Sequence, residues 1–245
     1  MAPTATISRS VLSEQVKDHL LEAILDGRYP PGARIVETRV ARELGTSQAP
    51  VREALRDLEA LGVIESTAFR GARVRRPTTA ELLEAFVIRT ELESLGAGLA
   101  IPHLSDADFE DLELQLTRMR AAADAGDVHA EAAADAAFHG TVVERAGNRT
   151  LQRVWRTLEP YSRTFITLAA AGIDRRSVAD EHQPILDALR RRDPAIAVAA
   201  YRRHFANTEA RLRAAWDASQ PAATEAVVPA SSGSGHRPAA QPPAA

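Results

Sequence analysis

Three histidines and one aspartate in the C-terminal half of the chain have the types and spacing of a metal site. Asp135 and His139 are four residues apart, so both side chains project from one face of a predicted helix. His182 follows Glu181 on a later predicted helix, and His204 lies near the middle of the last one. Three imidazoles and one carboxylate from three helices of a bundle can converge on one divalent metal ion. Zn, Ni and Mn are all compatible with this ligand set.

Residue type and spacing leave two other interpretations open. A lone histidine is more often a hydrogen-bonded core or surface residue than a ligand, and we interpret the other four in that way: His19, His103, His129 and His236. An open site of three histidines and one aspartate could also activate water in a hydrolase, with Glu181 as the general base. Turnover of esters or amides would favour the enzyme, whereas a ligand-dependent loss of DNA binding would favour a sensor.

The elements that must position this site are predicted to be helices. From Thr78 to about Asp217 the sequence has helical periodicity and little strand signal. Thr79 is predicted to cap the first helix, whose inward residues are Leu82, Phe86, Arg89 and Leu92. The later helices are predicted from the Ser105/Asp108 capping box to near Gly126, from Asp127 to Ala146-Gly147, from Asn148, from Ser177 to Arg192, and from Asp193-Pro194 to Trp216. Short polar connectors predict an antiparallel bundle.

Arg89 is the candidate anchor for an anionic ligand beside the metal. A guanidinium on an inward helix face needs an anionic partner, and its planar fork fits a carboxylate. Glu93, four residues further on, is the competing partner in a structural ion pair. The spacing alone does not choose between these two roles.

A helix-turn-helix is predicted in the N-terminal part of the chain. The helix from Glu37 to Leu44 ends at Gly45, which can take the left-handed conformation that closes a helix. Ser47 is a good N-cap for the next helix, and Pro50 falls in its first turn, where a missing N–H costs little. The apolar stripe of this second helix comprises Val51, Ala54, Leu55, Leu58 and Leu61. A second helix presented in this way can enter the major groove of DNA.

The polar face of the second helix and the segment after it support DNA binding. Gln48, Arg52 and Arg56 lie on one side, where Gln can bind an adenine edge and Arg a guanine or a phosphate. After Gly62 the residues alternate as they do in a strand, the chain turns at Arg70-Gly71, and a basic strand follows. This pattern predicts a small hairpin, or wing. The alternative is a helical hairpin with a solvated charged face. The residues predicted to contact DNA are Arg39, Arg42, Ser47, Gln48, Ala49, Pro50, Arg52, Arg56, Arg70 and Gly71.

Composition limits the class of protein. The chain of 245 residues is 45% hydrophobic, enough to bury two modest cores, and its length suggests one or two domains. It has no cysteine, which excludes disulfides and thiolate metal sites. No segment has the ~18 unbroken apolar residues of a membrane span, and the N-terminus lacks a signal peptide's apolar core, so we expect a cytoplasmic protein without membrane partners. Residues up to Pro77 carry 12 basic and 10 acidic side chains, and this small basic excess suits a domain that binds DNA in pairs.

The N-terminal segment resembles the DNA-binding domain of the GntR family of bacterial transcription regulators. The matching residues are Tyr29-Pro30-Pro31-Gly32, Glu37, Ala41, Leu44-Gly45, Ser47, Pro50 to Leu55, Leu58, Gly62 and Arg70-Gly71. Where this family usually has Arg directly after the Ser, this chain has Gln48. The resemblance implies the family's fold but a different base preference at one operator position.

The C-terminal segment resembles the FCD ligand-binding domain of the FadR subfamily. The stretches that carry this resemblance are AADAAFHGTVVERAGNRTL and ADEHQPILDALRRRDPAIAVAAYRRHF. In that subfamily the Asp and His of D-x3-H, the His after Glu and a His on the last helix bind a metal, which implies this role for Asp135, His139, His182 and His204. Asn148 and Arg163 are implied as effector-pocket residues, although Asn148 is also a natural helix cap.

These patterns predict a mainly α protein with a winged helix-turn-helix at 8–77, an all-α, FCD-like antiparallel bundle at 78–217 and a disordered Ala/Pro/Ser-rich tail at 218–245. We expect a regulator, not an enzyme, that binds a palindromic double-stranded operator as a homodimer. Most simply it is a repressor released by a small carboxylate bound next to the divalent metal. The alternatives are a metal-dependent hydrolase and a regulator whose metal is only structural.

Overall fold

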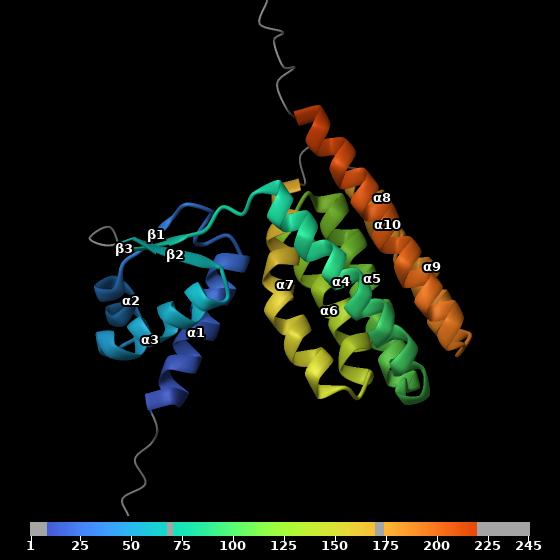
Figure 1. Cartoon of the computed structure of the whole chain (residues 1–245), viewed down its shortest axis with the longest axis horizontal. Coiled ribbons are helices and arrows are strands. Elements are labelled where there is room, and N and C mark those ends of the chain that lie inside the picture. The colour runs from blue at the N-terminus through green and yellow to red at the C-terminus, as the bar shows by residue number, and fades with distance from the viewer. Residues whose placement is uncertain (1–8, 68–70, 170–173, 220–245) are drawn as a thin grey trace, which may run out of the picture.

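The chain folds into two domains that follow one another along the sequence (Figure 1). The computed structural model describes residues 9–67, 71–169 and 174–219. A small domain of helices and a three-stranded sheet precedes a larger bundle of helices, and the chain passes from one to the other between Val74 and Thr79. This confirms the predicted mainly α fold. The predicted tail begins within the last helix, which runs to Ser219, and its remainder lies outside the described residues.

The N-terminal domain, here called the winged domain, is a helix-turn-helix with a small antiparallel sheet. Its elements are α1 (Arg9–Leu25), β1 (Arg34–Ile35), α2 (Glu37–Glu43), α3 (Gln48–Ala60), β2 (Ile64–Thr67) and β3 (Gly71–Val74). The sheet order is β1-β3-β2, and Ala72 and Val74 of β3 face the helices. The hairpin of β2 and β3 confirms the wing. Strand β1 was not predicted because two residues are too few to show alternation.

The turn between α2 and α3 has the conformation that the sequence predicts. Gly45 adopts a positive φ of 63°, and Ser47 is the N-cap of α3, although its side chain makes no capping hydrogen bond. Apolar residues on one side of α3 are buried in the core of the winged domain: Val51, Ala54, Leu55 and Leu58. Burying this stripe against α1 and the sheet leaves the opposite, polar face of α3 exposed.

The C-terminal domain, here called the bundle, consists of helices that pack around one main core. Its elements are α4 (Thr79–Ala100), the 3-10 helix η1 (Ile101–His103), α5 (Asp106–Ala125), α6 (Val128–Arg145), α7 (Arg149–Ala169), α8 (Arg175–Asp180), α9 (Gln183–Arg190) and α10 (Pro194–Ser219). Helix α6 packs against α4, α5 and α7, so that its residues reach the centre of the bundle. None of the helices in the described ranges is long and apolar enough to cross a membrane.

The helix starts follow from local hydrogen bonds. The predicted capping box of Ser105 and Asp108 and the N-cap Asp127 are both present. The predicted cap of α4 was one residue late: the N-cap is Thr78, whose side chain accepts a hydrogen bond from the backbone N–H of Glu81. The Glu81 side chain in turn accepts a hydrogen bond from the backbone N–H of Thr78, which completes a capping box.

The predicted single helix from Ser177 to Arg192 was wrong, because the chain breaks there into α8 and α9. Pro184 lies in the first turn of α9, where a proline is tolerated, but inside one continuous helix it would remove a hydrogen bond and clash with the preceding turn. The break makes His182 the N-cap residue of α9 and buries its side chain in the bundle.

Candidate functional site

Helix α6 and the start of α9 bring Asp135, His139 and His182 together inside the bundle. Asp135 and His139 lie on α6, and His182 begins α9. The Nε2 atoms of His139 and His182 are 3.2 Å apart. Asp135 Oδ1 lies 3.1 Å from His182 Nε2 and 3.7 Å from His139 Nε2. All three side chains are buried, so the polar atoms of this group meet in the protein interior.

The other ring nitrogens of His139 and His182 face oxygen atoms. His139 Nδ1 lies 2.6 Å from Glu93 Oε2, and His182 Nδ1 lies 3.2 Å from the carbonyl oxygen of Ala179. When both rings are neutral and keep the proton on Nδ1, each Nε2 presents a lone pair. In that form the two lone pairs and the Asp135 carboxylate face one another, an arrangement that a cation stabilises. Carboxylate and carbonyl contacts of this kind orient metal-binding imidazoles.

His204 joins this group from α10. One nitrogen from each of the three rings lies within 4.8 Å of the others, and the ring centroids of His182 and His204 are 4.5 Å apart. His204 Nδ1 is buried and has no hydrogen-bond partner in the part of the chain that the structure describes. Burial first, and then the neighbouring His182 and His139, lower the pKa of His204 well below its ordinary value. A neutral imidazole is the form that binds metal, so the three histidines fit a divalent cation, and the Asp135 carboxylate lies beside two of them, His139 and His182.

A buried charge network lies beside the four candidate ligands. Arg89 on α4 is 3% exposed, forms an ion pair with Glu93 and places its Nη2 atom 3.4 Å from Asp135 Oδ2. The indole N–H of Trp155 donates to Glu93 Oε1 at 2.7 Å. Burial alone would lower the pKa of Arg89, but the charges of Glu93 and Asp135 outweigh this effect and raise the pKa above its ordinary value. The guanidinium is therefore charged. Burial would likewise raise the pKa of Asp135, but His139, His182 and Arg89 hold it below its usual range.

The ion pair of Arg89 and Glu93 along α4, which was predicted as the alternative to an effector anchor, is present. Two contacts between helices were not predicted: Glu93 with His139, and Arg89 with Asp135. The spacing within one helix gives no signal for either contact, since each depends on how α4 packs against α6. The role of Arg89 in effector binding stays a prediction.

The other two candidate effector residues contact a helix start and the winged domain. Asn148 is exposed, and its side-chain oxygen accepts hydrogen bonds from the backbone N–H groups of Thr150 and Leu151 at 3.1 Å each, which caps α7. Arg163 on α7 faces Glu22 of the winged domain instead, with 3.6 Å between Nη1 and Oε1. An effector role for either residue stays a prediction.

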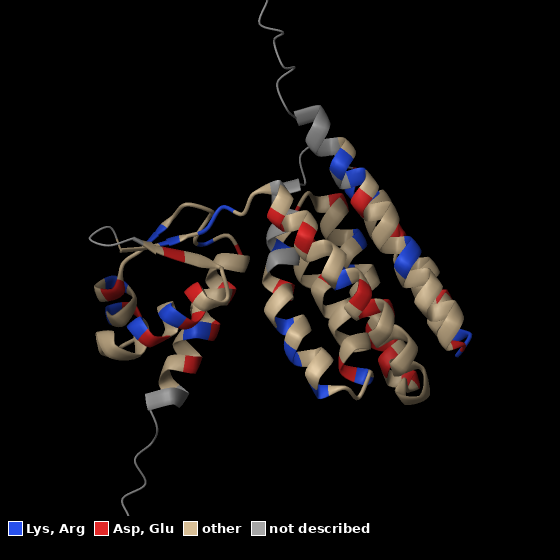
Figure 2. Ribbon diagram, in the orientation of Figure 1, with Lys and Arg blue, Asp and Glu red and all other residues tan. Residues whose placement is uncertain are grey.

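The exposed face of α3 carries the residues predicted to bind bases. Gln48, Arg52 and Arg56 are all exposed. Arg52 Nη2 donates to the Gln48 side-chain oxygen at 3.0 Å, and Arg52 Nε donates to Glu37 on α2 at 2.7 Å. The two side chains therefore form one polar unit at the start of α3, held in place by α2. Basic and acidic residues alternate over this part of the winged domain (Figure 2).

The remaining candidates divide between exposed and buried positions. Arg39, Arg42, Ser47 and Gly71 are exposed, Ala49 is half-buried, and Pro50 is buried in the core. Arg70 lies outside the described residues. The unpredicted strand β1 adds one more basic side chain to the sheet, because exposed Arg34 is the cross-strand partner of exposed Arg73. Like charges in opposite positions repel, so the pair favours a polyanionic partner.

Comparisons with known proteins agree with this division into two domains. Residues 12–74 match the family described as bacterial regulatory proteins of the gntR family, and residues 84–207 match the FCD domain. The chain belongs to the GntR family. It is therefore a transcriptional regulator of a family whose members bind operator DNA. The resemblance seen in the sequence is confirmed.

The GntR-family chain is similar to repressors of sugar metabolism. It is 38% identical over 205 residues to a probable D-xylose utilization operon transcriptional repressor of Paenarthrobacter nicotinovorans, spanning 84% of this chain and 90% of that protein. It is 24% identical over 224 residues to the gluconate operon transcriptional repressor of Bacillus subtilis, spanning 87% and 90%. Among solved structures, McbR/YncC of E. coli superposes with a TM-score of 0.73 at 24% identity, over 84% of this chain and 98% of that one, and shows the same fold.

This GntR-family chain allows a direct test of α3 as the recognition helix. Arg52→Ala should weaken specific operator binding by about 1–3 kcal/mol, and Gln48→Arg should change the preferred base from adenine to guanine rather than abolish binding. Fluorescence anisotropy on an operator selected from random duplexes measures both effects. Arg191→Ala, at an exposed arginine of the bundle, is the matched control. Unchanged affinity and preference in both α3 variants would exclude α3 as the recognition helix.

Proposed function

We propose that the chain is a homodimeric repressor whose operator binding is controlled by a small carboxylate effector next to a divalent metal. The metal ligands are Asp135, His139, His182 and His204. When bound, the metal supplies open coordination positions that a carboxylate can occupy. We infer a homodimer because one winged domain has only a small basic excess, and because a dimer presents two such domains to the two-fold symmetry of a palindromic operator.

One observation carries the metal-dependent part of this proposal. The Nε2 atoms of His139 and His182 and the carboxylate of Asp135 converge in the protein interior, and the other ring nitrogens contact Glu93 and Ala179. Buried groups that only accept hydrogen bonds do not face one another at 3.1–3.7 Å without a proton or a cation between them. The matched families are those of DNA-binding regulators, which supports a sensory role over hydrolysis.

Arg89 supports the carboxylate class of effector. Its buried guanidinium lies beside the candidate ligands. One of its nitrogens is 3.4 Å from Asp135, which is long for a charge-assisted hydrogen bond. A carboxylate that enters beside the metal can take a shorter bond from this guanidinium. Glu93 keeps the guanidinium in place through its own ion pair.

Gluconate and D-xylose are the first compounds to test, because two relatives are repressors of operons for gluconate and for D-xylose utilization. They form a matched pair, since one is a carboxylate and the other a neutral sugar. We expect gluconate, and not D-xylose, to release metal-loaded protein from its selected operator. Release by the neutral sugar alone would contradict the carboxylate class.

Arg89→Lys should weaken the gluconate response while operator affinity and metal content stay unchanged. Lysine keeps the buried positive charge opposite Glu93 and Asp135 but lacks the planar fork. A charge-assisted hydrogen bond contributes about 1.5–3 kcal/mol, which corresponds to a roughly ten- to hundredfold higher gluconate concentration for half-release. Anisotropy titrations of wild type and variant measure this shift. An unchanged half-release concentration would leave Arg89 with a structural role only.

A further inference from the structure

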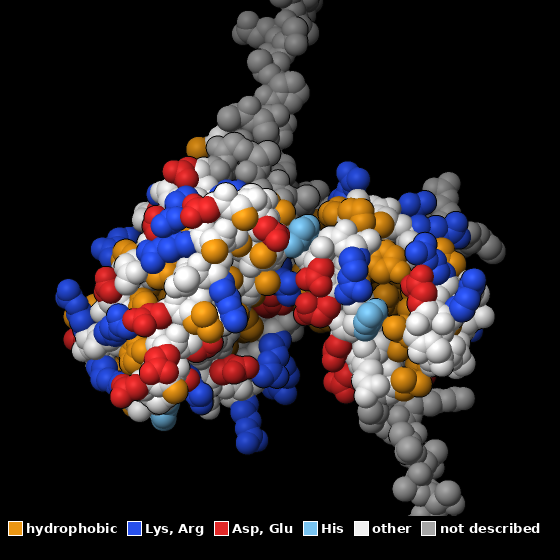
Figure 3. All heavy atoms as spheres, turned by 180° about the vertical axis from the view of Figure 1, so that it is seen from behind, with side chains coloured by type: hydrophobic (Ala, Val, Ile, Leu, Met, Phe, Trp, Pro, Cys, Tyr) orange, Lys and Arg blue, Asp and Glu red, His pale blue; other side chains and the backbone are white. Residues whose placement is uncertain are grey.

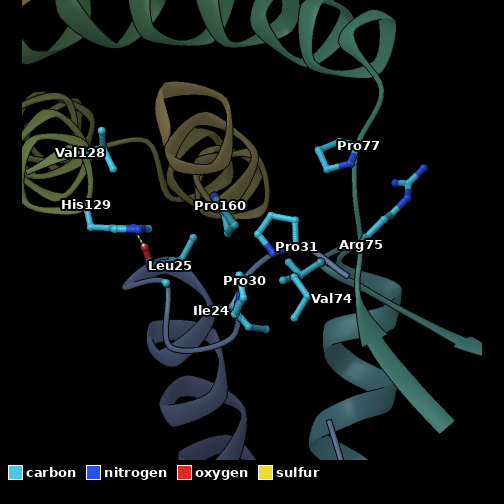
Figure 4. Close-up of a pocket in the computed structure, with 13 residues that line it drawn as sticks. Ile24, Leu25, Pro30, Pro31, Val74, Arg75, Pro77, Val128, His129 and Pro160 are labelled. Atoms are coloured by element: carbon cyan, nitrogen blue, oxygen red, sulfur yellow. Dashed lines mark hydrogen bonds between the residues drawn. The ribbon is translucent and has the colours of Figure 1, made fainter. Parts of the chain in front are cut away.

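The winged domain and the bundle meet at a cleft lined by both. Figure 4 shows this cleft, with Ile24, Leu25 and Pro30 from the winged domain facing Val128, His129 and Pro160 from the bundle. Its volume of about 180 Å³ is below the roughly 300–1,000 Å³ of typical ligand pockets. Its basic groups are already engaged, since Arg75 pairs with Glu81 and His129 bonds to a backbone carbonyl. The cleft is therefore better explained as a contact between domains than as a ligand site.

Arg163 is the charged centre of this contact. Its guanidinium is on α7, yet Nη1 lies 3.6 Å from Glu22 Oε1 and Nη2 lies 3.6 Å from Asp26 Oδ1, both carboxylates at the end of α1 or just after it. The side chain of Arg163 is only 8% exposed. Acidic side chains gather along the border of the winged domain that faces the bundle (Figure 3). A buried guanidinium needs anionic partners, and two of its three come from the other domain.

A histidine supplies a second contact across the same border. His129 Nδ1, near the start of α6, donates to the carbonyl oxygen of Leu25 at 2.8 Å. Gly27 makes room for this ring: it has a φ of +78°, and a Cβ added there would lie 2.5 Å from His129 Nε2. His129 was interpreted from the sequence as an ordinary histidine, and only the packing of the two domains shows its contact.

A third carboxylate near Arg163 comes from the bundle itself. Glu159 lies one turn earlier on α7, with its Oε1 atom 3.8 Å from Arg163 Nε. Arg163 therefore has one anionic partner on its own helix and two in the winged domain.

We propose that Arg163, with Glu22 and Asp26, is a latch that fixes the winged domain against the bundle. Arg163 is then a positioning residue rather than an effector ligand. The latch does not rest on the proposed function.

The latch can be tested by distance measurement on the full chain. The protein has no cysteine, so spin labels can be placed cleanly at Glu14→Cys on α1 and Glu110→Cys on α5, both exposed positions. We expect a narrow distance distribution in the wild-type background. Arg163→Met should broaden it about twofold, because relative motion is the default between domains with a small interface. Arg153→Met, at an exposed arginine of the same helix, should leave it unchanged.

Variants on the opposite side separate the latch from a folding defect. Glu22→Gln with Asp26→Asn alters only half-exposed side chains of the winged domain, and should broaden the distribution as much as Arg163→Met does. Combining all three changes should add nothing further, as expected for residues of one interaction. A narrow distribution in Arg163→Met, or in the carboxylate variant, would overturn the latch. Neither result depends on DNA or metal binding.

Discussion

Replacing Glu93 with alanine should cost about 3–5 kcal/mol of stability, because it leaves a buried charge without its main partner. Glu93 is fully buried and contacts Arg89, His139 and Trp155. Burial would raise its pKa, but Arg89 and His139 lower it, so the group is a carboxylate in the folded protein. Without it, the guanidinium of Arg89 keeps Asp135, at 3.4 Å, as its anionic partner among the described residues, and the Trp155 N–H loses its acceptor. Urea denaturation of wild type and variant measures the loss.

Two variants on the same helix sharpen this test. Glu91→Ala removes an exposed ion pair with Arg202 at 2.8 Å and should change stability little. Glu93→Gln keeps the shape of the side chain and an oxygen that can accept a hydrogen bond from Trp155, but it loses the charge. Its stability should therefore lie between those of Glu93→Ala and the wild type. Equal stability of Glu93→Ala and Glu91→Ala would contradict the buried network.

Removing the metal should lower the melting temperature of the wild-type protein by on the order of 10 °C. A ligand at about a thousand times its dissociation constant stabilises a fold by about 4 kcal/mol, and each kcal/mol corresponds to about 2–4 °C in a protein of this size. The ion would tie together α6, α9 and α10, which carry His139, His182 and His204. Thermal unfolding with and without chelator measures the shift.

The variant His139→Ala with His204→Ala should melt at the same temperature with and without chelator. His103→Ala, at an exposed histidine of the same domain, should respond to chelator as the wild type does. A chelator effect that persists undiminished in the double variant would place the metal elsewhere.

Much of the fold follows from local sequence signals. Gly45, the apolar stripe of α3 and the Ser105–Asp108 capping box each act within a few residues, and the structure has all three where they were predicted. Among the four candidate ligands, Asp135 and His139 follow from such a signal, because their spacing fixes a common helix face. His182 and His204 have no local signal of this kind and were assigned from the resemblance to the FCD domain.

The features that the sequence did not reveal depend on contacts between distant segments. The contact of Glu93 with His139 requires α4 to pack on α6, and the contact of Arg163 with Glu22 requires the two domains to meet. Neither leaves a periodic pattern in the chain. The break before α9 was signalled by Pro184, yet the apolar periodicity on both sides of it resembled one helix.

The most direct test of the proposed metal site is elemental analysis of the full chain, purified without chelator. We predict about one divalent ion per wild-type chain and none in the His139→Ala/His204→Ala variant, since the buried imidazoles are the binding groups. A wild-type chain that carries no ion, and that binds none on dialysis against Zn²⁺, Ni²⁺ or Mn²⁺, would contradict the assignment of Asp135, His139, His182 and His204 as metal ligands.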